Sequence, residues 1–273
     1  MRTIIKCNDS DWVRMVSKQP DETAWRTVEA VQKSCAILEG LKRTNGAGIT
    51  ELSEHLDMSK AGVHSYLATL RQNEFVVKEG STYKLSLRFL DFGESAKQNL
   101  DLYEVVQEEV ATLAESTGEV AQFMVEEHGW GIYICKKRGD SAVQTASYMG
   151  DRKHLHCTGV GKAILASLPR ERVDAIIDKR GLPRRTENTI TNREDLYEEL
   201  DEINDSGVAF DDEEILEGLR CVAIPVISQE KGLLGAISVS GPTSRMRGTR
   251  LREEIPETVR DTANVVQINS SHL

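Results

Sequence analysis

The sequence predicts an α+β protein made of an N-terminal winged helix-turn-helix, a linker helix and a C-terminal sheet with flanking helices. Two patterns predict this fold class: helical periods followed by a short hairpin over residues 25–93, and strand-like runs alternating with helical ones after residue 117. The length of 273 residues also exceeds that of most single domains. We therefore expect four parts: a flexible tail (1–24), the winged helix-turn-helix (25–93), the linker helix (94–116) and a second domain (117–273).

The composition is that of a globular protein, with 39% hydrophobic and 29% charged residues. No apolar run approaches the roughly 18 residues that a membrane span needs, and the first residues lack the apolar core of a signal peptide. We therefore expect a cytoplasmic protein with no membrane partner. The five cysteines are odd in number, scattered and never spaced C-x-x-C, so we expect reduced thiols. They are Cys7, Cys35, Cys135, Cys157 and Cys221.

Charge is distributed unevenly along the chain, whose net charge is −10. Residues 25–93 carry nine Lys and Arg against eight Asp and Glu, whereas the residues after 93 carry 21 against 32. An acidic body repels phosphates, so a nucleic acid is expected to meet the near-neutral N-terminal part. The alternative is that the acidity serves only solubility.

The first elements follow from helical periods and capping residues. Residues 1–24 show no period, and Met15 offers a second start codon. The first helix has an apolar stripe at three- and four-residue steps. The stripe consists of Val28, Val31, Cys35, Leu38 and Leu41. Thr50 and Ser59 are good N-caps, so they predict the starts of a second and a third helix.

The third helix is the expected recognition helix. Its Val63, Leu67 and Leu70 form a buried stripe, which leaves an opposite, exposed face. A turn at 79–82 between two strand-like runs then predicts the wing. In this arrangement the helix enters the major groove and flanking cations contact phosphates. The expected DNA-contacting residues are Ser59, Lys60, Ala61, His64 and Ser65 on the helix, with Arg71, Lys78 and Lys84 beside it, and Arg88 is a further candidate. A winged helix that binds protein instead of DNA is the alternative.

Residues 94–116 have an apolar stripe typical of a helix that packs on its own domain or on a second subunit. Its members are Leu102, Val105, Val106, Val110 and Leu113. Beyond Gly118, strands are expected at 120–125, 132–135, 221–227 and 233–240, and helices at 159–168, 171–178 and 193–205.

These residues together resemble the IclR family of transcription regulators. The N-terminal motifs are 31–39, 50–56, 59–70, 83–85 and 90–93, and the C-terminal motifs are 155–163, 207–214, 218–226 and 235–242. They occur in the family's order from about residue 25 to the end. One departure is Ala61-Gly62, where the family often has Ser-Thr, and another is Ser65, where it often has Arg.

The resemblance implies a sequence-specific DNA-binding regulator that represses or activates transcription. It also implies a GAF-like or profilin-like effector-binding domain over 117–273, a homodimer or tetramer, and an operator that is an inverted repeat in double-stranded DNA. The implied effector is a small molecule, an organic acid, held by Gly159, Val160, Asp211, Cys221, Ser238 and Ser240.

The chemistry of these residues is coherent without the family. Ser238 and Ser240 lie two apart on an expected strand, so they face the same side. A glycine-led helix start at Gly159 offers free backbone N–H groups to a carboxylate. In the alternative, the serines only satisfy neighbouring backbone and the glycines only allow close packing. The segment 158–162 lacks the spacing of a nucleotide-binding phosphate loop.

The cysteines and histidines indicate two alternative functions, a metal-sensing regulator and a cysteine-dependent hydrolase. His154, His156 and Cys157 do not have a standard zinc spacing, so solvated loop histidines and no bound metal or cofactor are expected, with a metal-sensing regulator as an alternative. Cys157 or Cys221 with a histidine base would make a cysteine-dependent hydrolase. No third orienting group stands at a recognisable spacing, so the chain is expected not to be an enzyme.

Overall fold

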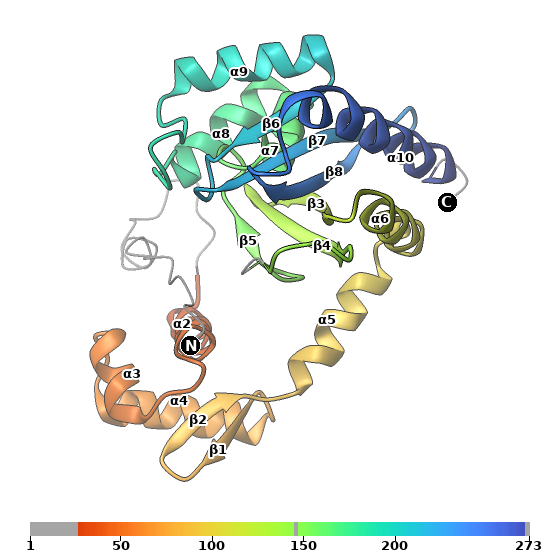
Figure 1. Ribbon diagram of the computed structural model, residues 1–273. Helices are drawn as coiled ribbons and strands as arrows, with labels where there is room; N and C mark the ends of the chain where they lie inside the picture. The colour runs from red at the N-terminus through yellow and green to blue at the C-terminus, as the bar shows by residue number, and fades with distance from the viewer. Residues whose placement is uncertain (1–26, 145–146, 271–273) are drawn as a thin grey trace. The chain divides into compact units, whose positions relative to one another are not determined.

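The computed structural model describes residues 27–144 and 147–270. The chain divides into two compact units, Met1–Glu94 and Ser95–Leu273 (Figure 1). The expected tail over residues 1–24, with Cys7 and the second start codon, lies outside the described residues.

The N-terminal unit follows the predicted order of three helices and a hairpin. Its elements are α2 (Glu29–Thr44), α3 (Ile49–His55), α4 (Lys60–Gln72), β1 (Val76–Glu79) and β2 (Thr82–Leu85). Their apolar faces meet in one core around Ile37, Leu52 and Leu67, each at most 1% exposed. The hairpin turns at Gly80, whose positive φ of 60° suits a residue without a Cβ.

Two details of the predicted first helices are wrong. The N-cap of α3 is Gly48, so Thr50 lies inside that helix. Of the predicted stripe only Leu41 is buried and Leu38 half-buried, whereas Cys35 is exposed and Val28 and Val31 are 62% and 59% exposed. A helical period gives the direction of an apolar face, but it does not give the length over which a neighbour covers that face.

The linker is not the single helix expected over residues 94–116. The structure has α5 (Arg88–Gln98), which buries none of its residues, and α6 (Tyr103–Thr117), separated by a short turn. The predicted stripe is correct within α6, where Val106, Val110 and Leu113 are buried. The helical period therefore predicted α6 correctly. Extending the predicted helix back to residue 94 was wrong, because the turn between α5 and α6 interrupts it.

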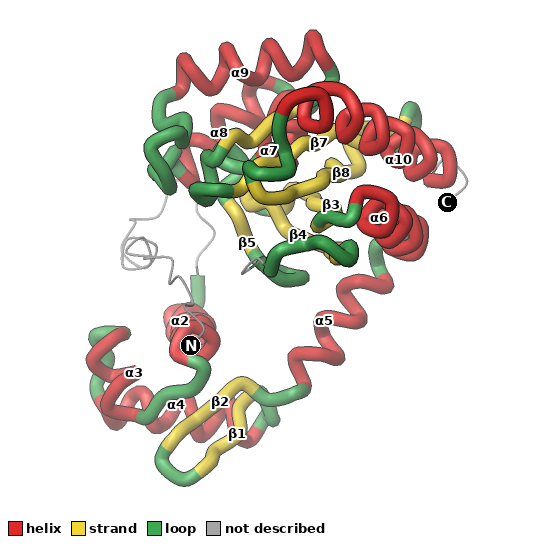
Figure 2. The backbone as a smooth tube through the Cα atoms, in the orientation of Figure 1, coloured by secondary structure: helices red, strands yellow, loops and turns green. Residues whose placement is uncertain are grey.

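The C-terminal unit is built on a six-stranded antiparallel sheet in the order β5-β4-β3-β8-β7-β6, which confirms the α+β class (Figures 1 and 2). The strands are β3 (Val120–Glu127), β4 (Trp130–Arg138), β5 (Arg152–Lys153), β6 (Ala209–Asp212), β7 (Leu219–Ser228) and β8 (Gly232–Pro242). After α6, the helices are α7 (Gly159–Ala166), α8 (Arg170–Arg180), α9 (Arg193–Ser206), the π-helical turn η1 (Arg250–Glu254) and α10 (Ile255–Ser270). The edge strands β5 and β6, η1 and α10 were not predicted.

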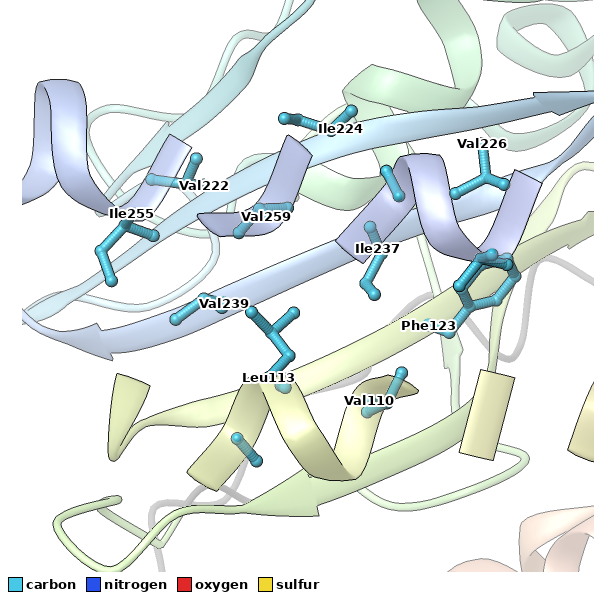
Figure 3. Packing of buried hydrophobic residues seen from close by; sticks show 14 of the residues in the cluster. Val110, Leu113, Phe123, Val222, Ile224, Val226, Ile237, Val239, Ile255 and Val259 are labelled. Atoms are coloured by element: carbon cyan, nitrogen blue, oxygen red, sulfur yellow. The ribbon is translucent and has the colours of Figure 1, made fainter. Parts of the chain in front are cut away.

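The two faces of the sheet carry different side chains. One face presents bulky apolar groups to α6 and α10, among them Phe123, Ile224 and Ile237 (Figure 3). The other face presents Ala223 and Ala236 beneath α7 and its neighbours. Because successive residues of a strand point to opposite faces, each strand supplies both surfaces. The small residues leave room for α7 to approach the sheet closely.

Candidate DNA-binding surface and effector site

The recognition helix α4 begins at a capped serine and exposes the face that was predicted to read DNA. The Ser59 hydroxyl accepts a hydrogen bond from the backbone N–H of Gly62 at 3.1 Å. Val63, Leu67 and Leu70 are buried. The exposed residues of the helix and its cap include Ser59, Lys60, Ala61, His64 and Ser65. The Ser65 hydroxyl donates to the Ala61 carbonyl at 3.0 Å, so its proton is already engaged within the helix.

The cations beside α4 differ in their surroundings. Lys78 pairs with Tyr83 in the hairpin and Lys84 pairs with Val77, so the two lysines lie on opposite faces of the wing. Lys84 Nζ lies 2.6 Å from Glu79 Oε2, whereas Lys78 Nζ lies over the Tyr83 ring. Arg71 and Lys78 line one shallow groove together with Arg88.

Arg88 holds the start of α5 against the wing. Its guanidinium stacks on Phe75 and Phe92, with centroid distances of 4.9 and 5.6 Å, and donates to the Asn73 carbonyl at 2.5 Å. These contacts fix a cation at the C-terminal end of α4.

The six residues expected to hold an effector meet on the sheet face beneath α7. Asp211 of β6 lies opposite Cys221 of β7, and Cys221 lies opposite Ser240 of β8. Ser238 follows on the same side of β8. The Ser240 and Ser238 hydroxyls lie beside the Cys221 sulfur.

The N-terminus of α7 closes over this row. Thr158 caps the helix by accepting from Gly161 N–H at 3.0 Å. A Cβ on Gly159 would lie 3.3 Å from both the Asp211 backbone nitrogen and the Cys221 sulfur, so only a very small residue permits this approach. The backbone N–H of Val160 is directed at the same sulfur. The helix start therefore lies against the backbone of Asp211 and brings the Val160 amide to Cys221.

Asp211 is a buried carboxyl at the edge of this cluster. Its Oδ1 accepts from Glu214 N–H at 2.8 Å, and the residue is 2% exposed. Burial, together with the charge of Glu214, raises its pKa to about 7. Asp211 therefore exchanges a proton near neutral pH and can either donate to or accept from a ligand.

Lys162 forms ion pairs with two glutamates of the same chain, which argues against a role in binding phosphate. Its Nζ lies 2.5 Å from Glu214 Oε1 and 2.6 Å from Glu199 Oε1, and its side chain is 1% exposed. Burial opposes the charged form, but the two carboxylates more than compensate and raise the pKa of Lys162. The ammonium fixes α7 to α9 and to the segment that follows β6.

Sequence reasoning missed Gln122 of β3, which lies opposite Ser238 on this face. Its Nε2 donates to the Ser240 hydroxyl at 3.1 Å. The pairing of β3 with β8 joins residues 118 positions apart, so no local pattern could have revealed it.

Comparison with known proteins identifies both units. Residues 30–80 match the IclR helix-turn-helix domain, and residues 94–268 match the C-terminal domain of bacterial IclR transcriptional regulators. The chain belongs to the IclR family. The resemblance seen in the sequence is thereby confirmed, and the chain is a DNA-binding transcription regulator with a C-terminal effector-binding domain.

Individual relatives of this IclR-family chain agree. The HTH-type transcriptional regulator KdgR of Escherichia coli is 34% identical over 88% of this chain and 90% of its own. An IclR transcriptional regulator from Alicyclobacillus acidocaldarius superposes with a TM-score of 0.75 over 89% of this chain and 99% of its own, at 24% identity. An IclR homolog from Microbacterium hydrocarbonoxydans, solved with 4-hydroxybenzoate, gives 0.77 over 89% and 100%, at 17% identity, and so shares the fold.

The cysteines of this IclR-family regulator give no support to the hydrolase alternative. Cys157 and Cys221 are buried, and burial raises the pKa of each thiol to about 12. A thiol nucleophile reacts as the thiolate, which these surroundings disfavour. The relatives compared above are named as transcriptional regulators or homologs of one.

The expectation of solvated histidines is wrong. His154 and His156 are 8% and 2% exposed, and their ring centroids lie 5.6 Å apart. His154 packs edge-on against Trp130, and His156 Nε2 donates to the Pro183 carbonyl at 3.1 Å. Among residues 27–144 and 147–270, no three His, Cys, Asp or Glu side chains form a group that could hold a metal ion.

No helix within the described part of the chain is long and apolar enough to cross a membrane.

Proposed function

We propose that this regulator reads an operator with the exposed face of α4 and responds to a small organic acid bound at the N-terminus of α7. The observation that carries the effector site is the convergence of Gly159, Asp211 and Cys221 within contact distance of one another. These residues come from α7, β6 and β7, which the sheet brings together.

The proposed DNA contacts divide into two kinds. Lys60, His64 and Ser65 lie on the exposed face of α4 and reach base edges, with Ser59 and Ala61 at the helix start. Phosphates are contacted by Arg71, Lys78 and Lys84. Lys84 must exchange its Glu79 partner for a phosphate, so its net contribution is smaller than that of an unpaired lysine.

Lys60→Ala is expected to weaken binding to the operator more than binding to unrelated DNA, because it removes a base contact. Lys84→Ala is expected to weaken binding to all sequences alike and to lower the salt slope by about 1 or less, because it removes one phosphate contact. Fluorescence anisotropy at several salt concentrations measures both. Lys231→Ala, an exposed lysine of the C-terminal unit, is the control. Equal losses from both substitutions on every sequence would contradict this division.

We further propose that the chain acts as a homodimer or a tetramer on an inverted repeat. Exposed apolar side chains support self-association, since Val28 and Val31 before and on α2 and Leu87 and Leu90 at α5 are 59–82% exposed. A dimer presents two recognition helices to half-sites about one helical turn or a multiple apart. Light scattering that finds a monomer, both free and on DNA, would overturn this.

The effector chemistry follows from the donors at the site. Backbone N–H groups at the start of α7 and the hydroxyl of Ser240 donate to a carboxylate, and Ser238 and Asp211 pair with a hydroxyl or hydrate. A structural neighbour solved with 4-hydroxybenzoate, itself a carboxylate, supports this class. The effector changes DNA affinity through its different affinity for two states of the protein.

Ser238→Ala combined with Ser240→Ala is expected to abolish the effector response while DNA affinity stays within about twofold, because both hydroxyls lie in the C-terminal unit. A DNA-binding assay with increasing organic acid measures the response. Ser228→Ala, a buried serine at the far end of β7, is the matched control. A double variant that responds at the parent's acid concentration would place the site elsewhere.

A further inference from the structure

Gln122 is a buried amide whose carbonyl oxygen has no hydrogen-bond partner among the described residues. The residue is 4% exposed in the middle of β3. Its Nε2 donates to Ser240, and its Oε1 has no partner among the described residues. The neighbouring positions of the strand, Ala121 and Phe123, point to the apolar opposite face.

Nε2 of Gln122 faces Ser240 and donates to its hydroxyl, which leaves Oε1 as the group of the amide without a partner among the described residues.

A second polar atom without a regular hydrogen bond lies next to it. Ser238 is the cross-strand neighbour of Gln122, is fully buried and has an Oγ that makes no hydrogen bond of regular geometry within the described residues, although it lies beside Cys221. Directly opposed side chains of an antiparallel pair lie about 5 Å apart at Cβ. An acceptor and a hydroxyl are thus placed side by side, on the face that also carries the proposed effector residues.

Buried polar groups in native proteins almost always have partners, so two adjacent ones without a protein partner call for a group from outside the chain, either a ligand or a bound water. The group must donate to Gln122 Oε1 and pair with Ser238, which an alcohol does and a carboxylate does not. We propose that Gln122, together with Ser238, binds a hydroxyl group of the effector, so that the site selects hydroxy acids over unsubstituted carboxylic acids. This inference rests on the proposed effector site at the start of α7.

The test uses two pairs of acids matched in chain length, glycerate with propionate and gluconate with hexanoate. Calorimetric titration of the full-length protein is expected to show that the hydroxylated member of at least one pair binds about tenfold or more tightly than its partner. Gln122→Met keeps the length of the side chain and removes the amide. It is expected to lower the affinity for the hydroxy acid about tenfold and to leave the affinity for the unsubstituted acid unchanged.

Ser238→Ala, a smaller change at the opposing position, is expected to reduce the same preference, which keeps the inference testable if Gln122→Met does not fold. Equal binding of both members of each pair by the parent protein overturns the inference and leaves the proposed function standing. An equal loss for all acids in Gln122→Met assigns Gln122 a structural role and also overturns it. If none of the four acids binds the parent protein, the proposed organic-acid site fails and the inference fails with it.

Discussion

Lys162→Met is expected to lower the free energy of unfolding of the C-terminal unit by about 3–5 kcal/mol. The substitution fills the same space but leaves Glu214, whose side chain is 8% exposed, as a buried carboxylate without its cation. Breaking a buried pair costs more than the pair contributes, because the remaining charge stays out of water. Differential scanning calorimetry should show a fall in melting temperature on the order of 10 °C.

The control and the rescue separate charge from packing. Lys231→Met removes a lysine that is 44% exposed and 3.7 Å from Asp101, and is expected to change stability by less than about 1 kcal/mol. Adding Glu214→Gln to Lys162→Met should recover part of the loss, because the orphaned charge is gone. A Lys162→Met protein as stable as the parent would show that the ammonium is not needed where it lies.

Mild acid is expected to destabilise the double variant His154→Phe with His156→Gln much less than it destabilises the parent protein. Burial lowers the pKa of His154 to about 3 and that of His156 to about 4, from an ordinary value of 6.5. Below pH 6.5 the unfolded chain therefore binds two protons that the folded chain refuses, so stability falls as pH falls. The two histidines together contribute at most about 2.7 kcal/mol per pH unit until the pH nears the folded values.

Asp211 acts in the opposite direction within the same window. Its folded pKa is about 7 against an ordinary value of 3.8, so the folded chain holds a proton that the unfolded chain releases. It offsets the histidines by at most about 1.4 kcal/mol per pH unit. Glu214, whose pKa burial also raises, acts in the same direction as Asp211, and the double variant isolates the contribution of the histidines. Denaturant unfolding at about pH 6 and about pH 5 measures the slope, with His64→Asn on the exposed face of α4 as control. The same drop in the parent and in the double variant would refute the assignment.

The sequence pattern of a single segment was sufficient to predict elements that pack against segments nearby in the sequence. Val63, Leu67 and Leu70 predicted the buried side of α4, and Ser59 predicted its start, because capping and periodicity are local effects. The exposure of Val28 could not be predicted in this way, since the surface that covers an apolar stripe belongs to the rest of the fold.

The unpredicted elements β6 and α10 contain residues that are unusual in a strand or within a helix. β6 contains Asp211 and Asp212, which interrupt an apolar strand because one of them faces the polar cluster. α10 follows the π-helical turn η1 without a break, and its second residue is Pro256, so a proline lies at the junction of two helical segments. Polar residues in a strand and a proline within a helical run are both typical of loops in a sequence.

The candidate site was predictable only where the family supplied positions. The shared side of Ser238 and Ser240 follows from the strand period, but the approach of Gly159 to Cys221 depends on how α7 packs on the sheet. Gln122 required the register of β3 against β8. Contacts made by pairing across the sheet lie beyond what a single sequence displays.

The two faces of the sheet separate the side chains of the larger apolar core from those that we propose bind the effector. One apolar core, with Phe123 and Ile237, lies on one side, and the other side carries a second apolar core beneath α7 together with the polar residues that we propose bind the effector. Substitutions of these polar residues therefore leave the first core intact, and changes on the two sides are expected to combine additively. With the proposed site, descendants of such a scaffold are expected to acquire new effectors through a few replacements at Gln122, Ser238 and Cys221, without first acquiring extra stability.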